Sequence, residues 1–187
     1  MFDFQTMFNS SMAVLQHPSV ETFEANEKND LQAATIYVAL GGLVSGVFGA
    51  ISAAIQHTSV GGGLIGGILG AIIGFYIYLG IVYLLGRAFG GTGNFGELGY
   101  DLALFTAPLT AISSVLTLIP IVGGIVALVL AIYNIYLTYL GIQSGMNLPK
   151  DKAIIVMVII FVIGVAIVAC FALVIVGLLA AVSGSSQ

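Results

Sequence analysis

The sequence predicts an all-α, polytopic integral membrane protein with five transmembrane helices. Of its 187 residues, 59% are hydrophobic and only 6% are charged, whereas soluble domains carry about 25% charged residues. Four basic and eight acidic side chains cannot cover a water-facing surface, so lipid must solvate most of the chain. The apolar residues also form five separate stretches, each near the roughly 20 residues that a helix needs to cross a bilayer.

These stretches define a membrane domain at residues 31–182, between an N-terminal segment at 1–30 and a tail at 183–187. The predicted spans are 31–56, 61–85, 101–119, 121–142 and 153–182. The last span is long enough to require tilt or an interfacial first turn. The third contains Pro108, which lacks a backbone donor and is expected to kink the helix. That kink either shapes a cavity or is accommodated by neighbouring helices.

The basic residues segregate to one side of the predicted membrane. Lys28 precedes the first span, and Arg87 lies between the second and third. Lys150 and Lys152 lie between the fourth and fifth, while the opposite loops HTSV and LIPIV and the tail SGSSQ contain no Lys or Arg. The positive-inside rule therefore predicts a cytoplasmic N-terminus and an extracytoplasmic C-terminus.

The N-terminal segment is acidic, with five carboxylates and one lysine giving a net charge of −4. Four apolar side chains share one face of a predicted first helix: Phe4, Phe8, Met12 and Leu15. That face is suited to the membrane interface. A second short helix is predicted after Pro18, because proline suits a first helical turn and Glu21 would lie near the positive helix end. The segment is then either a docked cap or a partner-binding arm.

Small residues recur every four positions along the first two spans. The second span carries a main row and a partial second row: Gly62, Gly66, Gly70 and Gly74, then Gly63 and Gly67. The first span carries a matching row: Gly42, Gly46, Ala50 and Ala54. Such faces let lipid-embedded helices approach closely. The short linker favours an antiparallel hairpin in which the rows meet, and a seam between two copies of the chain is the alternative.

The residue sets needed for catalysis, cofactor binding or metal binding are missing from the sequence. The single cysteine, Cys170, excludes a disulfide within the chain and a Cys-based metal site. His17 and His57 lie on different segments without acidic or thiol partners at ligand spacing. The net charge of −4 argues against nucleic acid, which selects basic surfaces. We therefore expect no enzyme activity, no cofactor and no metal.

The stretch GGTGNFG, residues 90–96, contains the G-x-G-x-x-G frame of a dinucleotide-binding turn. Such a turn joins a strand to a helix in a βαβ unit, but here the glycines lie between two predicted spans. With 25 glycines in the chain, a chance match is expected. We interpret the stretch as a flexible cytoplasmic link and candidate partner surface, in which Gly93 and Gly96 permit tight turns.

The candidate partner-facing or structural positions lie around this link and in the third and fourth spans: Arg87, Gly91, Glu97, Tyr100, Asp101, Pro108, Asn134 and Tyr136. Asp101 is expected to open the third span at the interface, where a carboxylate suits the helix N-terminus. Asn134 lies deeper in the fourth span and is expected to hydrogen-bond to another helix. Tyr136 is expected to anchor its helix near the interface.

The order of several segments resembles the YIP family, the Ypt/Rab-GTPase-interacting five-span membrane proteins and their prokaryotic relatives. The segments are HPSVETF, YLLGRAFGGTGNFGELGYDLALFTAPL, LIPIVGG and IYNIYLTYLGIQ, with a basic loop before the last span. The matching positions are Gly86, Gly91, Tyr100, Pro108, Pro120, Gly123, Tyr136 and Gly141. The resemblance covers roughly residues 17–182.

This resemblance implies a cytoplasmic N-terminus, no catalytic activity and protein partners. Its eukaryotic members act in vesicle traffic and bind small GTPases and one another in endoplasmic reticulum and Golgi membranes. The N-terminal segment here is shorter and lacks their DLYGP-like motif. The chain therefore looks more like the prokaryotic branch. The resemblance implies the cell membrane for a prokaryotic chain and endoplasmic reticulum or Golgi membranes for a eukaryotic one.

The leading hypothesis is a non-enzymatic scaffold or adaptor that contacts membrane lipids and recruits protein partners through its cytoplasmic face. A homo-oligomer is compatible with this hypothesis. The alternative is a lipid or small-solute transporter with a groove near Pro108 and Asn134.

Overall fold

The part of the chain that the structure describes contains seven helices, and five of them are long and apolar enough to cross a membrane. A computed structural model describes residues 2–55, 57, 63–116 and 118–184. The helices are α1 (Phe4–Gln16), α2 (Val20–Asn26), α3 (Leu31–Ile55), α4 (Gly63–Ala88), α5 (Phe95–Leu116), α6 (Pro120–Gly145) and α7 (Lys150–Gly184). No strand occurs in these described ranges. The predicted all-α class with five candidate spans, α3 to α7, is confirmed.

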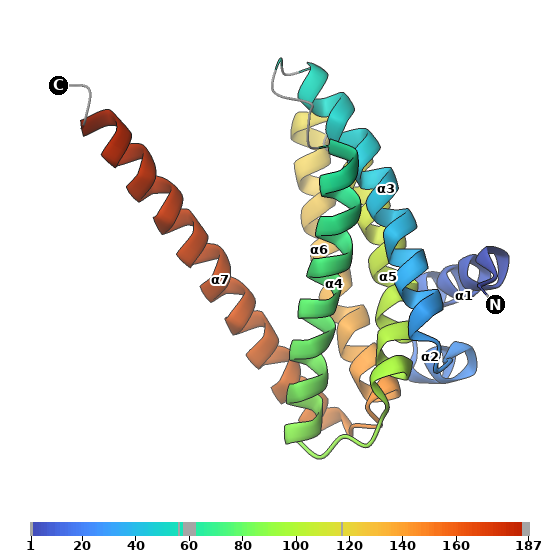
Figure 1. Ribbon diagram of the computed structural model, residues 1–187. Coiled ribbons are helices and arrows are strands. Elements are labelled where there is room, and N and C mark those ends of the chain that lie inside the picture. The colour runs from blue at the N-terminus through green and yellow to red at the C-terminus, as the bar shows by residue number, and fades with distance from the viewer. Residues whose placement is uncertain (1, 56, 58–62, 117, 185–187) are drawn as a thin grey trace.

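Four of the long helices form a bundle (Figure 1). α3 packs against α4 and α5, and α6 packs against α5. α7 contacts α4 and α6 near its start, where Ala153 and Val156 are buried. It then leaves the bundle at an inclination to the other helices, as Figure 1 shows. The inclination of α7 is relative to the other helices, so the tilt or interfacial first turn expected of this long span in a bilayer stays a prediction.

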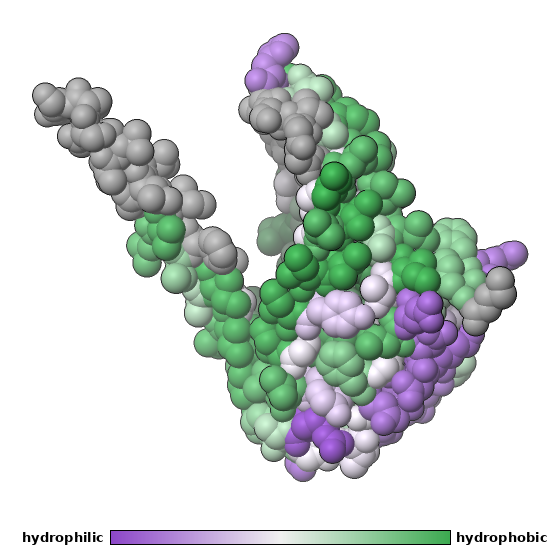
Figure 2. All heavy atoms as spheres, viewed as in Figure 1, coloured by the Kyte–Doolittle hydropathy of each residue, from purple (hydrophilic) through white to green (hydrophobic). Residues whose placement is uncertain are grey.

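The basic residues lie at one end of the bundle, where α3, α5 and α7 begin and α4 and α6 end. We call it the charged end, and the opposite end the far end. Lys28 precedes α3, Arg87 lies in the last turn of α4, and α7 begins at Lys150. Figure 2 shows hydrophilic residues gathered at this end and hydrophobic residues along the helices above it. The predicted segregation of charge is thus present in the fold, while the side of the membrane stays a prediction.

α3 and α4 form the predicted hairpin, but α4 uses a different face from the one expected. A Cβ on Gly42 would lie 2.8 Å from the carbonyl oxygen of Gly67, and one on Gly67 would lie 2.6 Å from Gly46 Cα. A Cβ added to a described glycine of the main α4 row would meet nothing within 4 Å; these glycines are Gly66, Gly70 and Gly74. The expected contact through that row is therefore wrong, and the partial second row makes the contact instead. Gly62 lies outside the described residues.

The two short helices begin at side-chain caps. The Asp3 carboxylate accepts hydrogen bonds from the Gln5 amide at 3.0 Å and the Thr6 hydroxyl at 2.6 Å. Ser19 Oγ accepts a hydrogen bond from the Thr22 amide at 3.1 Å and starts α2. Such caps satisfy amides that have no partner within the helix. The predicted second helix is confirmed, although it begins from Ser19 rather than with proline in its first turn.

Candidate functional site

The N-terminal arm, residues 2–30, is docked on the bundle. Phe23 of α2 is fully buried and packs edge to face on Phe105 of α5, with ring centroids 6.1 Å apart. At the end of α1, the carbonyl oxygen of Leu15 accepts a hydrogen bond of 2.6 Å from the Tyr133 hydroxyl of α6. Of the two alternatives for this segment, the structure contains the docked cap.

α1 presents one apolar face to the bundle and leaves another uncovered. Met7 and Val14 are buried, whereas the side chains on the predicted interfacial face are exposed: Phe4, Phe8 and Met12. That face borders an apolar groove of about 350 Å³ between α1, α3 and α5, which Tyr37 and Pro108 also line. An uncovered apolar face beside membrane spans suits contact with lipid at the interface.

The α4–α5 connection is packed against the end of α6. The amides of Thr92 and Gly93 donate hydrogen bonds to the carbonyl oxygen of Met146 at 2.9 and 3.4 Å. A Cβ on Gly93 would collide with the carbonyl oxygen of Gly145, and Gly90 has φ +92°, which favours glycine. The interpretation of this stretch as a flexible link is therefore wrong, because its glycines allow close backbone packing.

Two hydrogen bonds that Asn94 donates to the Glu97 carboxylate set the start of α5. Glu97 accepts from the Asn94 amide at 3.1 Å through Oε2 and from Asn94 Nδ2 at 2.9 Å through Oε1. This arrangement is a form of capping box, and it makes α5 begin at Phe95. Asp101 consequently lies one and a half turns inside the helix, where it is fully buried. The expected capping role of Asp101 at the start of the span is wrong.

The buried Asp101 carboxyl lies near two half-buried acids, Glu27 of the arm and Glu97 of α5. Neither of its carboxyl oxygens has a hydrogen-bond partner among the described residues. The Ser144 hydroxyl lies beside this carboxyl but donates its hydrogen bond to Glu27 Oε2 at 3.1 Å. Burial raises the pKa of the Glu27 carboxyl above its ordinary value; the Ser144 hydrogen bond opposes that shift, and the charge on Glu97 adds to it. The partly buried Glu27 therefore favours its neutral form more than an exposed glutamate does.

Cation–π contacts hold two more candidate residues at the charged end. The Nζ of Lys28 lies 6.0 Å from the ring centroid of Tyr100, which is itself buried. Arg87 lies 6.0 Å from the Tyr83 ring centroid and donates to the carbonyl oxygen of Gly91 at 3.2 Å. Arg87, Gly91, Glu97, Tyr100 and Asp101 therefore gather in one region, and most of them are structural there.

Tyr136 is 45% exposed on α6. It lines a hollow of about 420 Å³ at the charged end together with Glu21 of α2 and Lys150 of α7. Of the candidate residues, it is the one with the most accessible aromatic ring. No group of three or more His, Cys, Asp or Glu side chains in the described ranges is arranged to hold a metal ion.

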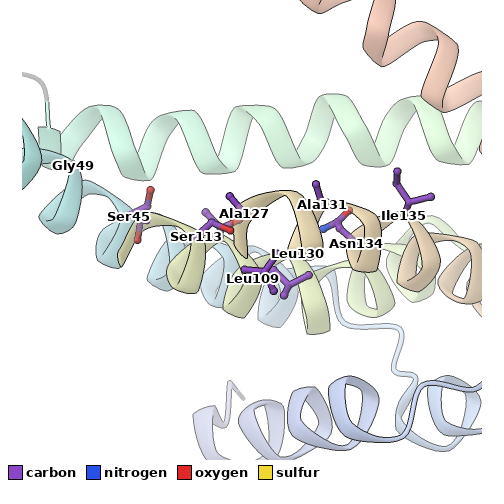
Figure 3. A pocket seen from close by; sticks show the side chains of 11 residues that line it. Ser45, Gly49, Leu109, Ser113, Ala127, Leu130, Ala131, Asn134 and Ile135 are labelled. Atoms are coloured by element: carbon purple, nitrogen blue, oxygen red, sulfur yellow. The ribbon is translucent and has the colours of Figure 1, made fainter. Parts of the chain in front are cut away.

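The remaining candidates, Pro108 and Asn134, line different cavities, so the predicted shared groove is wrong. Pro108 lines the apolar groove beneath α1. Asn134 lines a cavity of about 600 Å³ between α3, α5 and α6 (Figure 3). Its side chain has no hydrogen-bond partner within the described residues, so the expected bond to another helix is also wrong.

Three lining residues of this cavity were missed by sequence reasoning: Ser45, Thr110 and Ser113. The available signal was the spacing of Thr110 and Ser113, because hydroxyls three residues apart lie on one helix face. Glu27 and Ser144 were also missed, since nothing local predicts that the arm folds back onto the end of α6.

The fold and these sites define a polytopic integral membrane protein whose charged end is closed by its own N-terminal arm. The Yip1 domain family model matches residues 12–173, which is most of the chain, and the chain belongs to this family. The match begins inside α1 and ends inside α7, so it includes residues 12–30 of the docked arm as well as the bundle. No curated protein and no solved structure matches the chain.

Proposed function

We propose that the protein is a non-enzymatic membrane scaffold that recruits protein partners through its charged end. In this proposal the charged end faces the cytoplasm, because all four basic residues lie there and the positive-inside rule applies. The observation that carries the proposal is the docking of the arm. A docked arm presents a fixed surface, so a partner does not have to meet the entropy cost of ordering it.

The chemistry of that surface favours a basic partner. Glu21 and Glu24 are exposed on α2, which the buried Phe23 side chain holds against the bundle. Acidic groups fixed in this way increase the association rate and the selectivity for a positively charged protein surface. Eukaryotic YIP relatives bind small GTPases, so a protein of that class is one candidate partner to test here.

The test uses the full chain in lipid nanodiscs as the bait, with purified candidate partners. Reversing the charge in a Glu21→Lys/Glu24→Lys variant should abolish specific binding, and the isosteric Glu21→Gln/Glu24→Gln variant should weaken it. Binding to the wild type should also fall as salt rises. His57→Lys, which adds positive charge at an exposed far-end position, is the control and should bind normally. Equal binding by the wild type and the charge-reversal variant would contradict the proposal.

The alternative function, movement of a lipid or small solute, has one observation in its favour. Asn134 lines a cavity at the level of the spans, as a substrate pathway requires. Flux in reconstituted liposomes that is lost in Asn134→Leu but retained in Glu21→Lys/Glu24→Lys would favour transport over scaffolding.

A further inference from the structure

Two cavities that α3 and α5 both line form a groove at the level of the spans. We call it the groove between α4 and α6, because α4 lines the smaller cavity and α6 lines the larger one. The two helices are joined by a hydrogen bond of 2.6 Å between the Tyr78 hydroxyl and Thr138 Oγ1. Towards the far end from this bond lie two cavities, of about 600 and 260 Å³, which share Thr110 of α5. The Tyr78–Thr138 bond therefore closes the groove towards the charged end, and α5 forms its floor.

Hydrogen-bonding groups without partners converge on the larger cavity. Several span hydroxyls donate to carbonyl oxygens of their own helix, as is usual in membrane helices: Thr35, Thr106 and Ser114. Four lining side chains have no partner in the part of the chain that the structure describes: Ser45, Thr110, Ser113 and Asn134. Figure 3 shows that Ser45, Ser113 and Asn134 come from three different helices around one hollow.

These groups need a polar occupant when the protein is in a bilayer. Lipid hydrocarbon offers no hydrogen bonds, so an amide or hydroxyl left without a partner is costly there. An occupant with both donors and acceptors would satisfy the four side chains together. The convergence of three helices on one polar hollow thus points to a ligand.

The charge and shape of the groove select the class of ligand. No charged side chain lines either cavity among the described residues, and the four basic residues lie at the charged end. An anionic phosphate would therefore lack a counter-charge, which disfavours it at this depth. Leu109, Leu130 and Ile135 supply apolar walls. An uncharged head with an apolar body fits this lining best.

The unused glycine row of α4 widens the groove. Gly70 and Gly74 line the smaller cavity, and a Cβ on either would meet nothing within 4 Å. α7 contacts α4 and α6 near its start and then diverges from both (Figure 1). A lipid in the bilayer can therefore reach the groove from the side on which α7 leaves.

We propose that the groove between α4 and α6 binds the uncharged head of a neutral membrane lipid that carries a hydroxyl and a carbonyl group. A diacylglycerol has this chemistry through its hydroxyl and esters, and a ceramide has it through its hydroxyls and amide. Asn134, Ser113 and Thr110 hydrogen-bond to the head, and the acyl chains lie along the apolar walls. This lipid site does not depend on the scaffold function proposed above.

The test is photo-crosslinking of the full chain in phosphatidylcholine nanodiscs. Diacylglycerol, ceramide and phosphatidate probes are compared, and labelled residues are located by peptide mapping. We expect saturable labelling of α4, α5 and α6 around the groove by one or both neutral probes, competed by the unlabelled lipid. A preference for one neutral probe assigns the site to the ester or to the amide lipid.

Two variants and one control sharpen this test. Asn134→Leu combined with Ser113→Ala should weaken apparent affinity roughly tenfold or more, because at least two hydrogen bonds are lost. Gly74→Leu places a side chain into open space in the groove and should block labelling without unfolding the protein. Tyr136→Phe removes an exposed hydroxyl from the same helix and should change nothing. Thermal unfolding confirms that each variant is folded.

Three outcomes would overturn the assignment. The first is preferred labelling by phosphatidate, which would show that the site selects an anionic head. The second is labelling by neutral probes that is not saturable or that spreads evenly along α7. The third is labelling of the groove that is unchanged in both folded variants.

Discussion

A methyl group added to most glycines at the charged end would press on a neighbouring atom, whereas one added along the face of α4 that is turned away from α3 would meet nothing within 4 Å. The crowded positions include Gly86, Gly91, Gly93, Gly96 and Gly145, and the open ones include Gly66, Gly70 and Gly74. The same residue type therefore has two uses in one bundle. At the charged end it allows backbones to approach closely, and along α4 it leaves space for a ligand.

The two regions also differ in how they bury side chains. From Leu98 to Phe105, α5 is buried without interruption, and the arm covers part of it. α7 is buried at Ala153 and Val156, and the side chains described beyond Val156 are half-buried or exposed. A close-packed region tolerates little change in volume, so the comparison predicts which substitutions the molecule will accept.

The largest effect is expected at Phe23, which holds the arm to the bundle. Phe23→Ala should weaken docking by about 3–5 kcal/mol, the usual cost of removing a buried aromatic ring. Limited proteolysis in nanodiscs should then cut α2 in the variant but not in the wild type. Phe8→Ala is the matched control, because Phe8 is 45% exposed, and it should leave α2 protected. Equal protection of α2 in Phe23→Ala and the wild type would show that the ring does not secure the arm.

The next largest effect is expected at Gly93, because a Cβ there would collide with the Gly145 carbonyl oxygen. Gly93→Ala should destabilise the protein by about 3 kcal/mol, the upper part of the range for overpacking, because backbone rather than a flexible side chain must move. Gly74→Ala should be close to neutral. Thermal unfolding in the same nanodiscs measures both, and similar midpoints for the two variants would contradict the comparison.

Adjacent glycines on α4 provide a closely matched pair. A Cβ on Gly67 would lie 2.6 Å from Gly46 Cα, whereas one on Gly66 meets nothing within 4 Å. Gly67→Ala should cost about 1–3 kcal/mol by forcing α3 and α4 apart, and Gly66→Ala should be tolerated. Unfolding midpoints measure the difference. A larger loss in Gly66→Ala would instead favour a seam between two copies along the main row.

The smallest expected effect is a pH dependence of arm docking. Burial raises the pKa of Glu27 above its ordinary value of 4.5. The Glu27 carboxyl therefore binds its proton more tightly in the docked arm than in the released arm. Docking is therefore favoured at low pH and weakens as pH rises through the raised pKa. Proteolysis of α2 should be slower at pH 5 than at pH 7.5, and Glu27→Gln should reduce the difference. If the proteolysis rates at pH 5 and pH 7.5 differ as much in Glu27→Gln as in the wild type, the pH dependence comes from other groups.

Hydrophobic length and charge were enough to predict the five spans and the grouping of the basic residues at one end. Hydrophobic length placed the start of the third span too late, at Asp101, because the polar residues at the start of α5 lower the mean hydropathy there. The helix nevertheless begins earlier, at Phe95, because Asn94 donates hydrogen bonds to Glu97. Hydrophobic length and charge also failed to choose between the glycine rows of α4. Both rows have the same period, and packing with α3 alone decides which row is covered.

The cavities depend on contacts that are distant in the sequence. Pro108 and Asn134 looked like partners because both interrupt apolar spans, but α1 covers the side of α5 that carries Pro108. The position of α1 is fixed by contacts such as that from Tyr133 to Leu15, which are 118 residues apart. Contacts at this separation leave no periodic signal in a single sequence.

Hydrogen exchange of the full chain in nanodiscs tests the central claim, the docked arm, most directly. The account predicts that the amides of residues 22–26, which are hydrogen-bonded from Ser19 onwards, exchange slowly. The amides of Thr92 and Gly93, which donate to the Met146 carbonyl oxygen, should exchange slowly as well. The α2 amides should lose their protection in Phe23→Ala, and the amides at positions 92 and 93 should lose theirs in Gly93→Ala. Exchange of α2 in the wild type at the rate of an unstructured peptide would contradict the account, because the arm would then be free.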